Sequence, residues 1–308
     1  MAPTRRIAVI QWQIRVLDLD YNHSKAREYI TEAAQNGAEL AVLPEYHLNG
    51  WAPQDPRWAD QAGESAKYLA RYQSIAKDAN ICLVPGTIIE KHPGPDGKDL
   101  FHNTAYFISN DGTILGSYRK KNIWHTERPH LTSSASDRHE AIDTPIGRIG
   151  MLICWDLAFP EAFRELIADG AQLVIIPTFC EYTRALCAME DGMNLIYSGT
   201  PNDASAEAKR HNPATEKLFL ESTITSRCFE NTCGIIFANA AGPEPNFLGI
   251  SQVTLPITGP VAKMGNEEGV LVAEMDMGLL DVAEDNYKVR ADIRREDWYY
   301  TYRHSTSQ

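Results

Sequence analysis

Long apolar runs are missing from this sequence of 308 residues. No stretch approaches the roughly 20 apolar residues that a membrane-spanning helix needs, and the N-terminal segment MAPTRRIAVIQWQ has no long apolar run ahead of a cleavage site. Because the apolar residues of this segment alternate as they do in a strand, we interpret it as part of the fold. The sequence therefore predicts a cytoplasmic protein with no membrane partner.

Positive charge is scarce, since 29 Lys and Arg residues stand against 41 Asp and Glu residues and the formal net charge is −12. A surface this acidic repels phosphate backbones and anionic lipids, so the composition predicts that nucleic acid is not a partner. The simpler interpretation of the excess charge is that it keeps the chain soluble.

Paired cysteines are also absent. The six cysteines are scattered, mostly in or beside apolar runs, and no two have the C-x-x-C spacing. This usage is typical of reduced intracellular thiols and argues against a disulfide framework or a zinc site. The histidines do not supply a metal site either, because His125 and His130 lie in a polar loop without the helical spacing of metal ligands. We therefore expect no metal. The cysteines are Cys82, Cys154, Cys180, Cys187, Cys228 and Cys233.

No Pro-, Gly- or Ser-rich linker divides the chain. We predict one domain over residues 1–308, with a core at about 5–291 and a C-terminal extension at about 292–308. Apolar periodicity and turn residues predict alternating strands and helices, with a hairpin turn at Asn110-Asp111-Gly112. This mixture predicts an α/β fold with mixed sheets. Strands are expected at 6–11, 39–43, 81–85, 102–109, 113–118, 148–153, 173–176 and 233–238, helices at 21–35, 65–79, 160–168 and 223–231, and an irregular polar segment at 181–217.

Two segments resemble each other. NGAELAVLP at 36–44 and DGAQLVIIP at 169–177 each contain a helix stop, a tight turn, a buried strand and a proline. A common helix-to-strand junction is one interpretation of the likeness. The alternative is a pseudo-symmetric core in which the two strands occupy related positions in two facing sheets.

Cys154 follows a buried apolar run and precedes a helix that Pro160 opens. Such a turn exposes backbone N–H groups that can stabilise an oxyanion and favour a thiolate. A core cysteine at the end of a strand is the simpler interpretation. A nucleophilic thiol, whose free pKa is about 8.5, needs a base or a cation nearby.

Two charged residues also end apolar strands and could serve the thiol. Glu45 follows the strand LAVLP, and enclosure would raise its pKa toward that of a general base. Lys120 ends the strand GSYRK, and an enclosed lysine between carboxylates would keep its charge. An exposed or helix-capping glutamate and a solvated basic turn are the simpler alternatives.

In order along the chain, these segments resemble the motifs of the nitrilase superfamily of carbon–nitrogen hydrolases. The resemblance implies a four-layer α-β-β-α sandwich with two mixed sheets, at least a homodimer, no cofactor, and a glutamate–lysine–cysteine triad. The matching segments are the strand at 7–11, Pro44-Glu45-Tyr46, Tyr118-Arg119-Lys120, Cys154-Trp155-Asp156, Phe159-Pro160-Glu161, the segment RCFEN at 227–231 and NAAG at 239–242.

By this resemblance, Glu45 is the general base, Lys120 stabilises the oxyanion and Cys154 is the nucleophile. Lys120 is preferred over Lys121 because it directly follows Tyr-Arg. The family's second glutamate matches Glu127. The backbone N–H of Trp155 would assist Lys120, and Tyr46 is expected to support the site or bind substrate.

The expected reaction is hydrolysis of a non-peptide C–N bond in a small amide or N-carbamoyl compound, through a thioester, with release of ammonia or an amine. Trp155-Asp156 after the cysteine resembles the amidase and carbamoyl-amine branches, whereas Leu157 and Ala158 replace the arginines with which N-carbamoyl amino acid hydrolases grip a carboxylate. A nitrilase, and an inactive family member that only binds ligand, remain alternatives. The segment 181–217 is expected to form a pocket wall or an oligomer contact, or to be a surface insertion.

Overall fold

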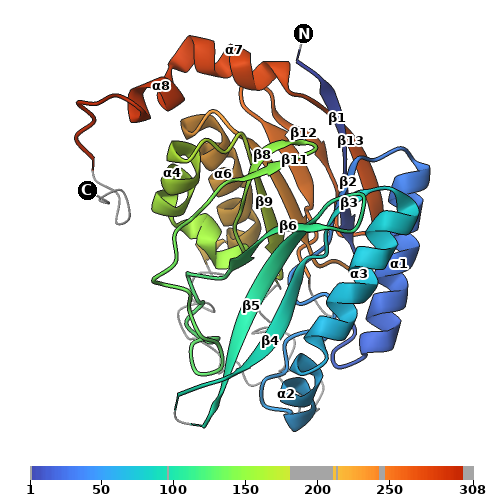
Figure 1. The fold of residues 1–308 in the computed structure, drawn as a ribbon. Helices are drawn as coiled ribbons and strands as arrows, with labels where there is room; N and C mark the ends of the chain where they lie inside the picture. Colours follow the sequence, from blue (N-terminus) through green and yellow to red (C-terminus); the bar gives the residue numbers. More distant parts are fainter. Residues whose placement is uncertain (1, 96, 181–210, 213, 243–246, 301–308) are drawn as a thin grey trace.

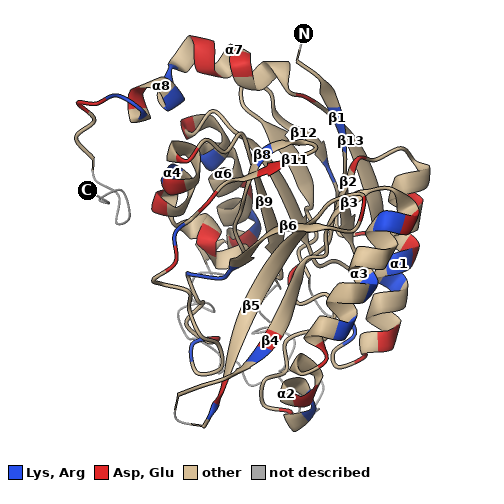
Figure 2. Cartoon of the chain, viewed as in Figure 1, with Lys and Arg blue, Asp and Glu red and all other residues tan. Residues whose placement is uncertain are grey.

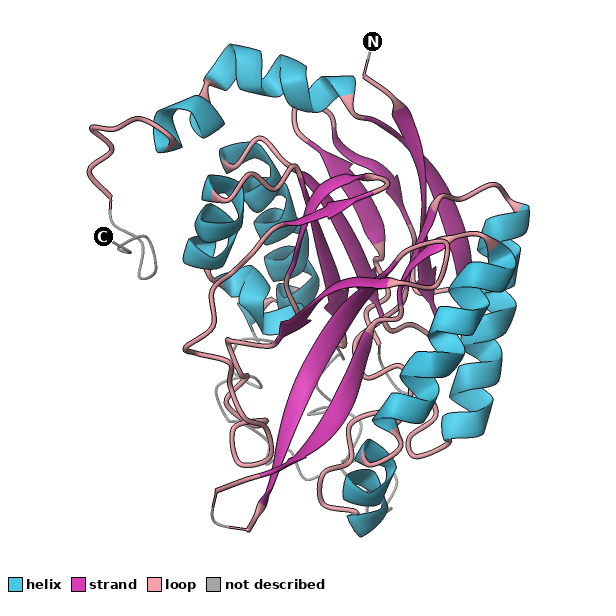
Figure 3. Ribbon diagram, in the orientation of Figure 1, coloured by secondary structure: helices cyan, strands magenta, loops and turns pink. Residues whose placement is uncertain are grey.

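The computed structural model describes residues 2–95, 97–180, 211–212, 214–242 and 247–300. Two β-sheets face each other, and helices cover the outer face of each sheet (Figures 1 and 3). Helices α1 (Leu19–Gln35) and α3 (Ser65–Ala79) cover the first sheet, and α4 (Pro160–Ala168) and α6 (Thr215–Glu230) cover the second. The predicted α-β-β-α sandwich with two mixed sheets is therefore confirmed.

The first sheet contains β1 (Thr4–Gln11), β2 (Leu40–Val42), β3 (Cys82–Val84), β4 (Thr87–Pro93), β5 (Asp99–Ile108), β6 (Ile114–Arg119) and β13 (Gly269–Asp276). Its order is β13-β1-β2-β3-β5-β4, and β6 pairs with β5. The second sheet contains β7 (Ile142–Thr144), β8 (Gly147–Met151), β9 (Leu173–Thr178), β10 (Gly234–Asn239), β11 (Gln252–Leu255) and β12 (Gly259–Lys263). Its order is β12-β11-β10-β9-β8-β7.

Strand β13 returns from the end of the chain to the first sheet. It pairs antiparallel with β1 along its whole length, from Thr4 opposite Asp276 to Gln11 opposite Gly269. On its other side β1 pairs with β2 in parallel. The first and last strands of the chain therefore lie side by side.

The similarity between residues 36–44 and 169–177 reflects equivalent positions in the two sheets. Strand β2 lies between the parallel strands β1 and β3, and β9 lies between the parallel strands β8 and β10. The two helix ends have the same hydrogen bonds, since Ala38 N donates to Ala33 O at 3.0 Å and Ala171 N donates to Leu166 O at 2.9 Å. Each turn contains a glycine with positive φ, which an L side chain would strain. The pseudo-symmetric arrangement is thus confirmed for these two strands.

The core between the sheets consists of apolar side chains, most of them aliphatic. Val9 and Val42 of the first sheet pack in one buried cluster with Met151, Ile175 and Phe237 of the second. Charged residues lie mainly on the outer helices and loops (Figure 2). No helix in the described residues is long and apolar enough to cross a membrane. Burial of apolar area between the two sheets is the main force that holds the layers together.

Several elements had no clear sequence signal. They are β4, β7, β11, β12, β13, α2 (Pro56–Ala62), α7 (Gly278–Tyr287), α8 (Val289–Ile293) and the short 3₁₀ helix η1 (Cys154–Ala158). The predicted end of the irregular segment at 181–217 is wrong, because α6 begins at Thr215, before the helix that was predicted at 223–231. The first turn of α6 faces solvent, so its apolar periodicity starts only with buried Leu220. Residues 181–210 lie outside the described part of the chain.

Candidate active site

The polar cluster of interest lies where the carboxyl ends of β2, β8 and β9 meet. After β2 the chain passes through Pro44 to Glu45, whose backbone N donates to Thr178 O at the end of β9, at 3.2 Å. Tyr46 N donates to Thr87 Oγ1 at 3.0 Å. A hydrogen bond between the sheets therefore fixes the turn that carries Glu45.

Lys120 joins two carboxylates inside the protein. Its Nζ lies 2.8 Å from Glu45 Oε1, and 3.0 and 2.8 Å from the two oxygens of Glu127. Glu45, Lys120 and Glu127 are 0%, 1% and 7% exposed. Burial alone would lower the pKa of Lys120, but Glu127 and Glu45 outweigh burial and raise this pKa well above its ordinary value. The ammonium therefore stays charged and separates two carboxylates that would otherwise repel each other.

The two oxygens of Glu45 differ in their surroundings. Oε1 accepts from Lys120 and, at 2.8 Å, from Asn103 Nδ2. Oε2 is buried and has no hydrogen-bond partner in the described structure. Burial raises the pKa of Glu45 well above its ordinary value, and the charge of an ionised Cys154 adds to this shift, whereas Lys120 opposes it. Oε2 is thus an unsatisfied proton acceptor on a carboxyl with raised proton affinity.

Glu127 is held by three different elements. Besides Lys120, its Oε1 accepts from Tyr46 Oη at 2.6 Å and its Oε2 accepts from Trp124 N at 3.0 Å. These donors come from the turn after β2, from the residue after β6 and from the loop that carries Glu127 itself. The carboxylate therefore fixes both Lys120 and the ring of Tyr46.

Cys154 is the first residue of η1 and has a φ of +46°, in the left-handed region that non-glycine residues rarely adopt. The residue as a whole is partly exposed. A hydrogen bond with Cys180, together with burial, raises the pKa of the Cys154 thiol, whereas Lys120 acts in the opposite direction. The first N–H groups of a helical turn have no intrahelical partners, so the backbone N–H of Trp155 is suited to bind a negative oxygen beside this thiol.

Asp156 links the Cys154 turn to the end of β6. Its Oδ2 accepts from Ile153 N and from Tyr118 Oη, both at 2.9 Å. Its Oδ1 accepts from the backbone N and the side-chain Nδ2 of Asn122, at 2.9 and 2.8 Å. Asp156 is fully buried. This one carboxylate therefore sets the position of the thiol turn relative to the strand that delivers Lys120.

The structure brings the sequence-predicted residues Glu45, Lys120, Glu127 and Tyr46 into direct contact and places Cys154 beside them. The ring of Trp155 packs edge-on against Trp124, with centroids 4.2 Å apart. Lys121 has another environment, since its Nζ donates to Asp137 O. Lys120 extends the ladder beyond the end of β6, since its N donates to Asn103 O at 2.8 Å, so its side chain and that of Lys121 point to opposite sides.

Sequence reasoning missed Asn103, Asp156 and Cys180. The hairpin offered a signal for Asn103, because Thr104 opposite Arg119 puts Asn103 beside Lys120. The sequence predicted no role for Asp156, which appeared only within the motif Cys154-Trp155-Asp156. Cys180 had no signal, because its contact with Cys154 depends on the pairing of β8 with β9.

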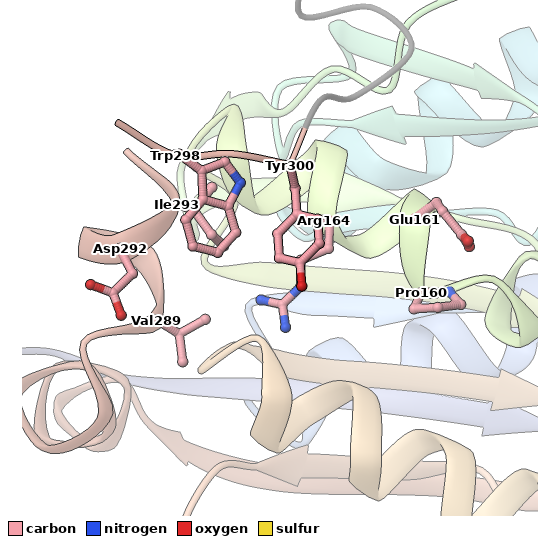
Figure 4. Close-up of a pocket in the computed structure, with 8 residues that line it drawn as sticks. All are labelled: Pro160, Glu161, Arg164, Val289, Asp292, Ile293, Trp298 and Tyr300. Atoms are coloured by element: carbon pink, nitrogen blue, oxygen red, sulfur yellow. The ribbon is translucent and has the colours of Figure 1, made fainter. Parts of the chain in front are cut away.

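A separate pocket of about 480 Å³ lies between α4, α8 and the C-terminal residues (Figure 4). Its lining includes Arg164, Trp298 and Tyr300, and none of the residues of the polar cluster. In the described residues no group of three or more His, Cys, Asp or Glu side chains is placed to hold a metal ion. The polar cluster, in contrast, combines a thiol, a base, a fixed cation and free N–H groups, which together can transfer an acyl group.

Known proteins resemble this chain along most of its length. A family model described as carbon-nitrogen hydrolase matches residues 6–284. An omega-amidase of Xenopus laevis is 28% identical over 306 residues, which cover 96% of each chain. A 2-oxoglutaramate amidase of Bacillus subtilis is 25% identical over 296 residues, covering 93% of this chain and 99% of the relative.

Solved structures agree in fold. A carbon-nitrogen hydrolase from Helicobacter pylori G27 superposes with a TM-score of 0.77 at 23% identity, over 96% of this chain and 97% of that chain. An amidase from Nesterenkonia sp. AN1, with acrylamide added to its active-site cysteine, has a TM-score of 0.68 at 25% identity and covers 90% of this chain and 95% of its own. The protein described here belongs to the carbon-nitrogen hydrolase family, within the nitrilase superfamily.

Proposed function

We propose that the protein is an amidase that hydrolyses a small amide through a thioester on Cys154, with Glu45 as general base and Lys120 as the cation that stabilises the oxyanion. The observation that carries this proposal is the unsatisfied, buried Oε2 of Glu45 in a cluster that also contains a charged lysine and a thiol. A buried acceptor without a partner is costly, so its presence beside a nucleophile is best explained by proton transfer.

The reaction has two halves. Glu45 takes the Cys154 proton, and the thiolate attacks the carbonyl carbon of the amide. Lys120 and the Trp155 N–H stabilise the tetrahedral oxyanion, and Glu45 returns the proton to the departing ammonia or amine. Glu45 then activates water, which hydrolyses the thioester and releases the acid.

Glu127 and Tyr46 support these steps without bonding to the reacting atoms. Glu127 accepts from Lys120 and from the Tyr46 hydroxyl, so it holds the ammonium against Glu45 and orients the ring of Tyr46. Removal of one partner from a buried charge pair leaves an uncompensated charge and costs about 3–5 kcal/mol. We propose Glu127 as a positioning residue and Tyr46 as part of the wall that contacts substrate.

The substrate is proposed to be an amide, because the relatives named above include amidases and because neutral Leu157 and Ala158 follow the Cys154 turn. An N-carbamoyl compound would fit the same chemistry, with an S-carbamoyl group on Cys154 in place of the thioester and its hydrolysis to carbon dioxide and ammonia, and a nitrile would enter through a thioimidate. Ammonia release measured on matched amides, ureido compounds and nitriles distinguishes these substrates.

We further propose that residues 1–308 work as one hydrolase domain in the cytoplasm and assemble as a homodimer or larger homo-oligomer. The aromatic residues Tyr299 and Tyr300 are 76% and 60% exposed, and Tyr300 lines the pocket beside α4. Exposed aromatic rings are enriched at protein interfaces. Sedimentation analysis of the full chain tests the assembly, and a monomer at micromolar concentration would reject it.

The test of the reaction uses Cys154→Ala and Glu45→Gln, with Cys82→Ala as a matched control in a buried cysteine of β3. We expect both site variants to stay folded and lose turnover, while Cys82→Ala keeps most of its activity. With an amide whose thioester is hydrolysed slowly, wild-type protein should accumulate an acyl group on Cys154, and mass spectrometry should detect it. A folded Cys154→Ala variant with only a few-fold loss would reject the mechanism.

A further inference from the structure

Cys180 lies beside the proposed nucleophile but has no part in the hydrolysis described above. Strands β8 and β9 run parallel with Met151 opposite Ile175, so the chain reaches Cys154 and Cys180 just beyond the same edge of the sheet. Both residues pack against the core between the sheets, and Cys180 lies close enough to Cys154 to raise the pKa of its thiol. Both residues are only partly buried, in contrast to Cys82, Cys228 and Cys233.

The backbone of Cys180 is held on both sides. Its N donates to Asn239 Oδ1 at 2.8 Å, and its O accepts from Leu248 N at 3.1 Å. Asn239 is itself fixed, because its Nδ2 donates to Gly249 O at 2.9 Å. The thiol of Cys180 is therefore presented to Cys154 by a supported segment.

We propose that Cys154 and Cys180 form a reversible disulfide when a peroxide oxidises the protein, and that this bond inactivates the enzyme while protecting its nucleophile. Two features of the geometry support the pairing. Both cysteines pack against the same core at the same edge of the sheet, and Cys154 interacts with Glu45, whose unsatisfied Oε2 can take its proton and so create the thiolate that reacts with peroxide.

The chemistry balances with one molecule of peroxide. The Cys154 thiolate attacks hydrogen peroxide, the O–O bond breaks, and Cys154 becomes a sulfenic acid while hydroxide leaves and takes up the proton as water. The Cys180 sulfur then attacks the sulfenic sulfur, its proton passes to the departing hydroxyl, and a second water leaves. The two thiols lose two electrons in total, which reduce the peroxide. A dithiol reductant restores both thiols by exchange.

A second close pair offers a built-in comparison. Cys228 Sγ contacts the backbone O of Cys233 at 2.9 Å, but both residues are fully buried. Burial raises the pKa of Cys233 to about 12. Without exposure or a neighbouring base, this pair should stay reduced under conditions that oxidise Cys154.

The experiment treats the folded full chain with hydrogen peroxide, blocks free thiols, and maps disulfides by peptide mass spectrometry. Activity is measured before and after dithiothreitol in wild type, Cys180→Ser, Cys187→Ser and Cys228→Ser. Cys187 lies outside the described residues and is included because it is near Cys180 in sequence. We expect a Cys154–Cys180 peptide in wild type, loss of activity with peroxide, and recovery with dithiothreitol.

Cys180→Ser separates the proposal from its alternatives. This variant should lose activity irreversibly and accumulate sulfinic or sulfonic acid on Cys154, whereas Cys187→Ser and Cys228→Ser should recover as wild type does. Recovery of Cys180→Ser to the wild-type level, or a wild-type disulfide between Cys154 and Cys187, would overturn the proposal. The activity readout rests on Cys154 as nucleophile, but the peptide map does not, so a failure of the proposed function remains distinguishable.

Discussion

Glu45 and Cys154 each lie at a point where the chain leaves a sheet through a left-handed residue. Tyr46, directly after Glu45, has a φ of +52°, and Cys154 has a φ of +46°. A non-glycine residue in this region costs about 1–3 kcal/mol where the surroundings enforce it. The enforcing contacts here are Tyr46 N to Thr87 Oγ1 and the Asp156 carboxylate below the Cys154 turn. The strained backbone at Tyr46 and Cys154 therefore helps to orient the Glu45 carboxylate and the Cys154 thiol.

The two adjacent lysines give a sharp test of the cation at the residue scale. Lys120→Ala should lower kcat by roughly 10²–10³, the usual loss for one oxyanion donor. Lys120→Gln should be nearly as damaging, because it keeps a donor but removes the charge that separates Glu45 from Glu127. Steady-state ammonia release from an accepted amide measures both effects.

Lys121→Ala is the matched control, since Lys121 precedes the same loop but donates to Asp137 O. Its loss of activity should be mild. An active Lys120→Ala together with an inactive Lys121→Ala would mean that the cation has been assigned to the wrong lysine. Circular dichroism on all three variants separates loss of the fold from loss of the charge.

Glu45, Lys120 and Cys154 were candidates without coordinates because each follows an apolar strand, whereas Glu127 came only from the resemblance to one family. The partners Asn103 and Cys180 needed the pairing of strands. Asn103 contacts Glu45 across 58 positions in sequence, and Cys180 reaches Cys154 only through the register of β8 and β9. Contacts of this kind are set by tertiary structure, which local pattern does not encode.

At the scale of elements, Asp156 connects the turn before η1 to the end of β6. Four hydrogen bonds from three residues converge on one buried carboxylate. Burial raises the pKa of Asp156, while the backbone N–H groups of Ile153 and Asn122 oppose this shift. The link lets two elements from different sheets hold the thiol and the ammonium at a fixed separation.

Asp156→Asn should lower kcat strongly, because one of its donors would then face an amide NH₂ instead of an oxygen. An unsatisfied buried donor costs about 1–3 kcal/mol, and the Cys154 turn would shift to relieve it. Tyr118→Phe is the milder comparison, since it removes only one of the four bonds to Asp156.

Kinetics and urea unfolding on both variants test this link. A role confined to stability would lower the unfolding midpoint of Asp156→Asn and leave kcat unchanged. Such a result would contradict the positioning role of Asp156.

The boundaries of elements were predictable where apolar periodicity and caps agreed. Helix α3 runs over Ser65–Ala79 and α4 over Pro160–Ala168, as the pattern predicted. Strand β12 shows the opposite case, since it is mostly exposed and has little apolar pattern to reveal it. Strand β13 pairs with a partner more than 250 positions away, which no local window contains.

At the scale of the whole molecule, one buried and one half-buried histidine affect stability in acid. His47 is fully buried and its Nε2 lies 2.7 Å from Tyr72 Oη, while His23 packs against the same ring. Burial, followed by the charge of His23, lowers the pKa of His47 to about 3, and burial lowers the pKa of His23 to about 4. An unfolded histidine has a pKa of about 6.5. At a pH between the lowered pKa values and about 6.5, the unfolded chain therefore binds more protons than the folded chain.

The free energy of unfolding should therefore fall as the pH falls below about 6.5, at up to about 1.4 kcal/mol per pH unit for each histidine. Urea unfolding between pH 7 and pH 5 measures this slope. His47→Gln, which keeps a partner for the Tyr72 hydroxyl, should show a shallower slope than wild type. His125→Gln, in an exposed residue, is the control.

The absolute stability of His47→Gln does not enter this test, because only the dependence on pH is compared. An unchanged slope in His47→Gln would contradict the assignment of acid sensitivity to this histidine. An equal change in His125→Gln would contradict it as well.

The pairing of β1 with β13 has a consequence for the nascent chain. Strand β1 leaves the ribosome early, yet one of its edges has no strand to bind until residues 269–276 have been synthesised. Until then this edge is an open template for other chains, and charged residues such as Arg5 and Arg6 at its start are the kind that discourage such pairing. A ribosome that stalls before β13 would release a chain with an open sheet, which is an expected target for chaperones and proteases.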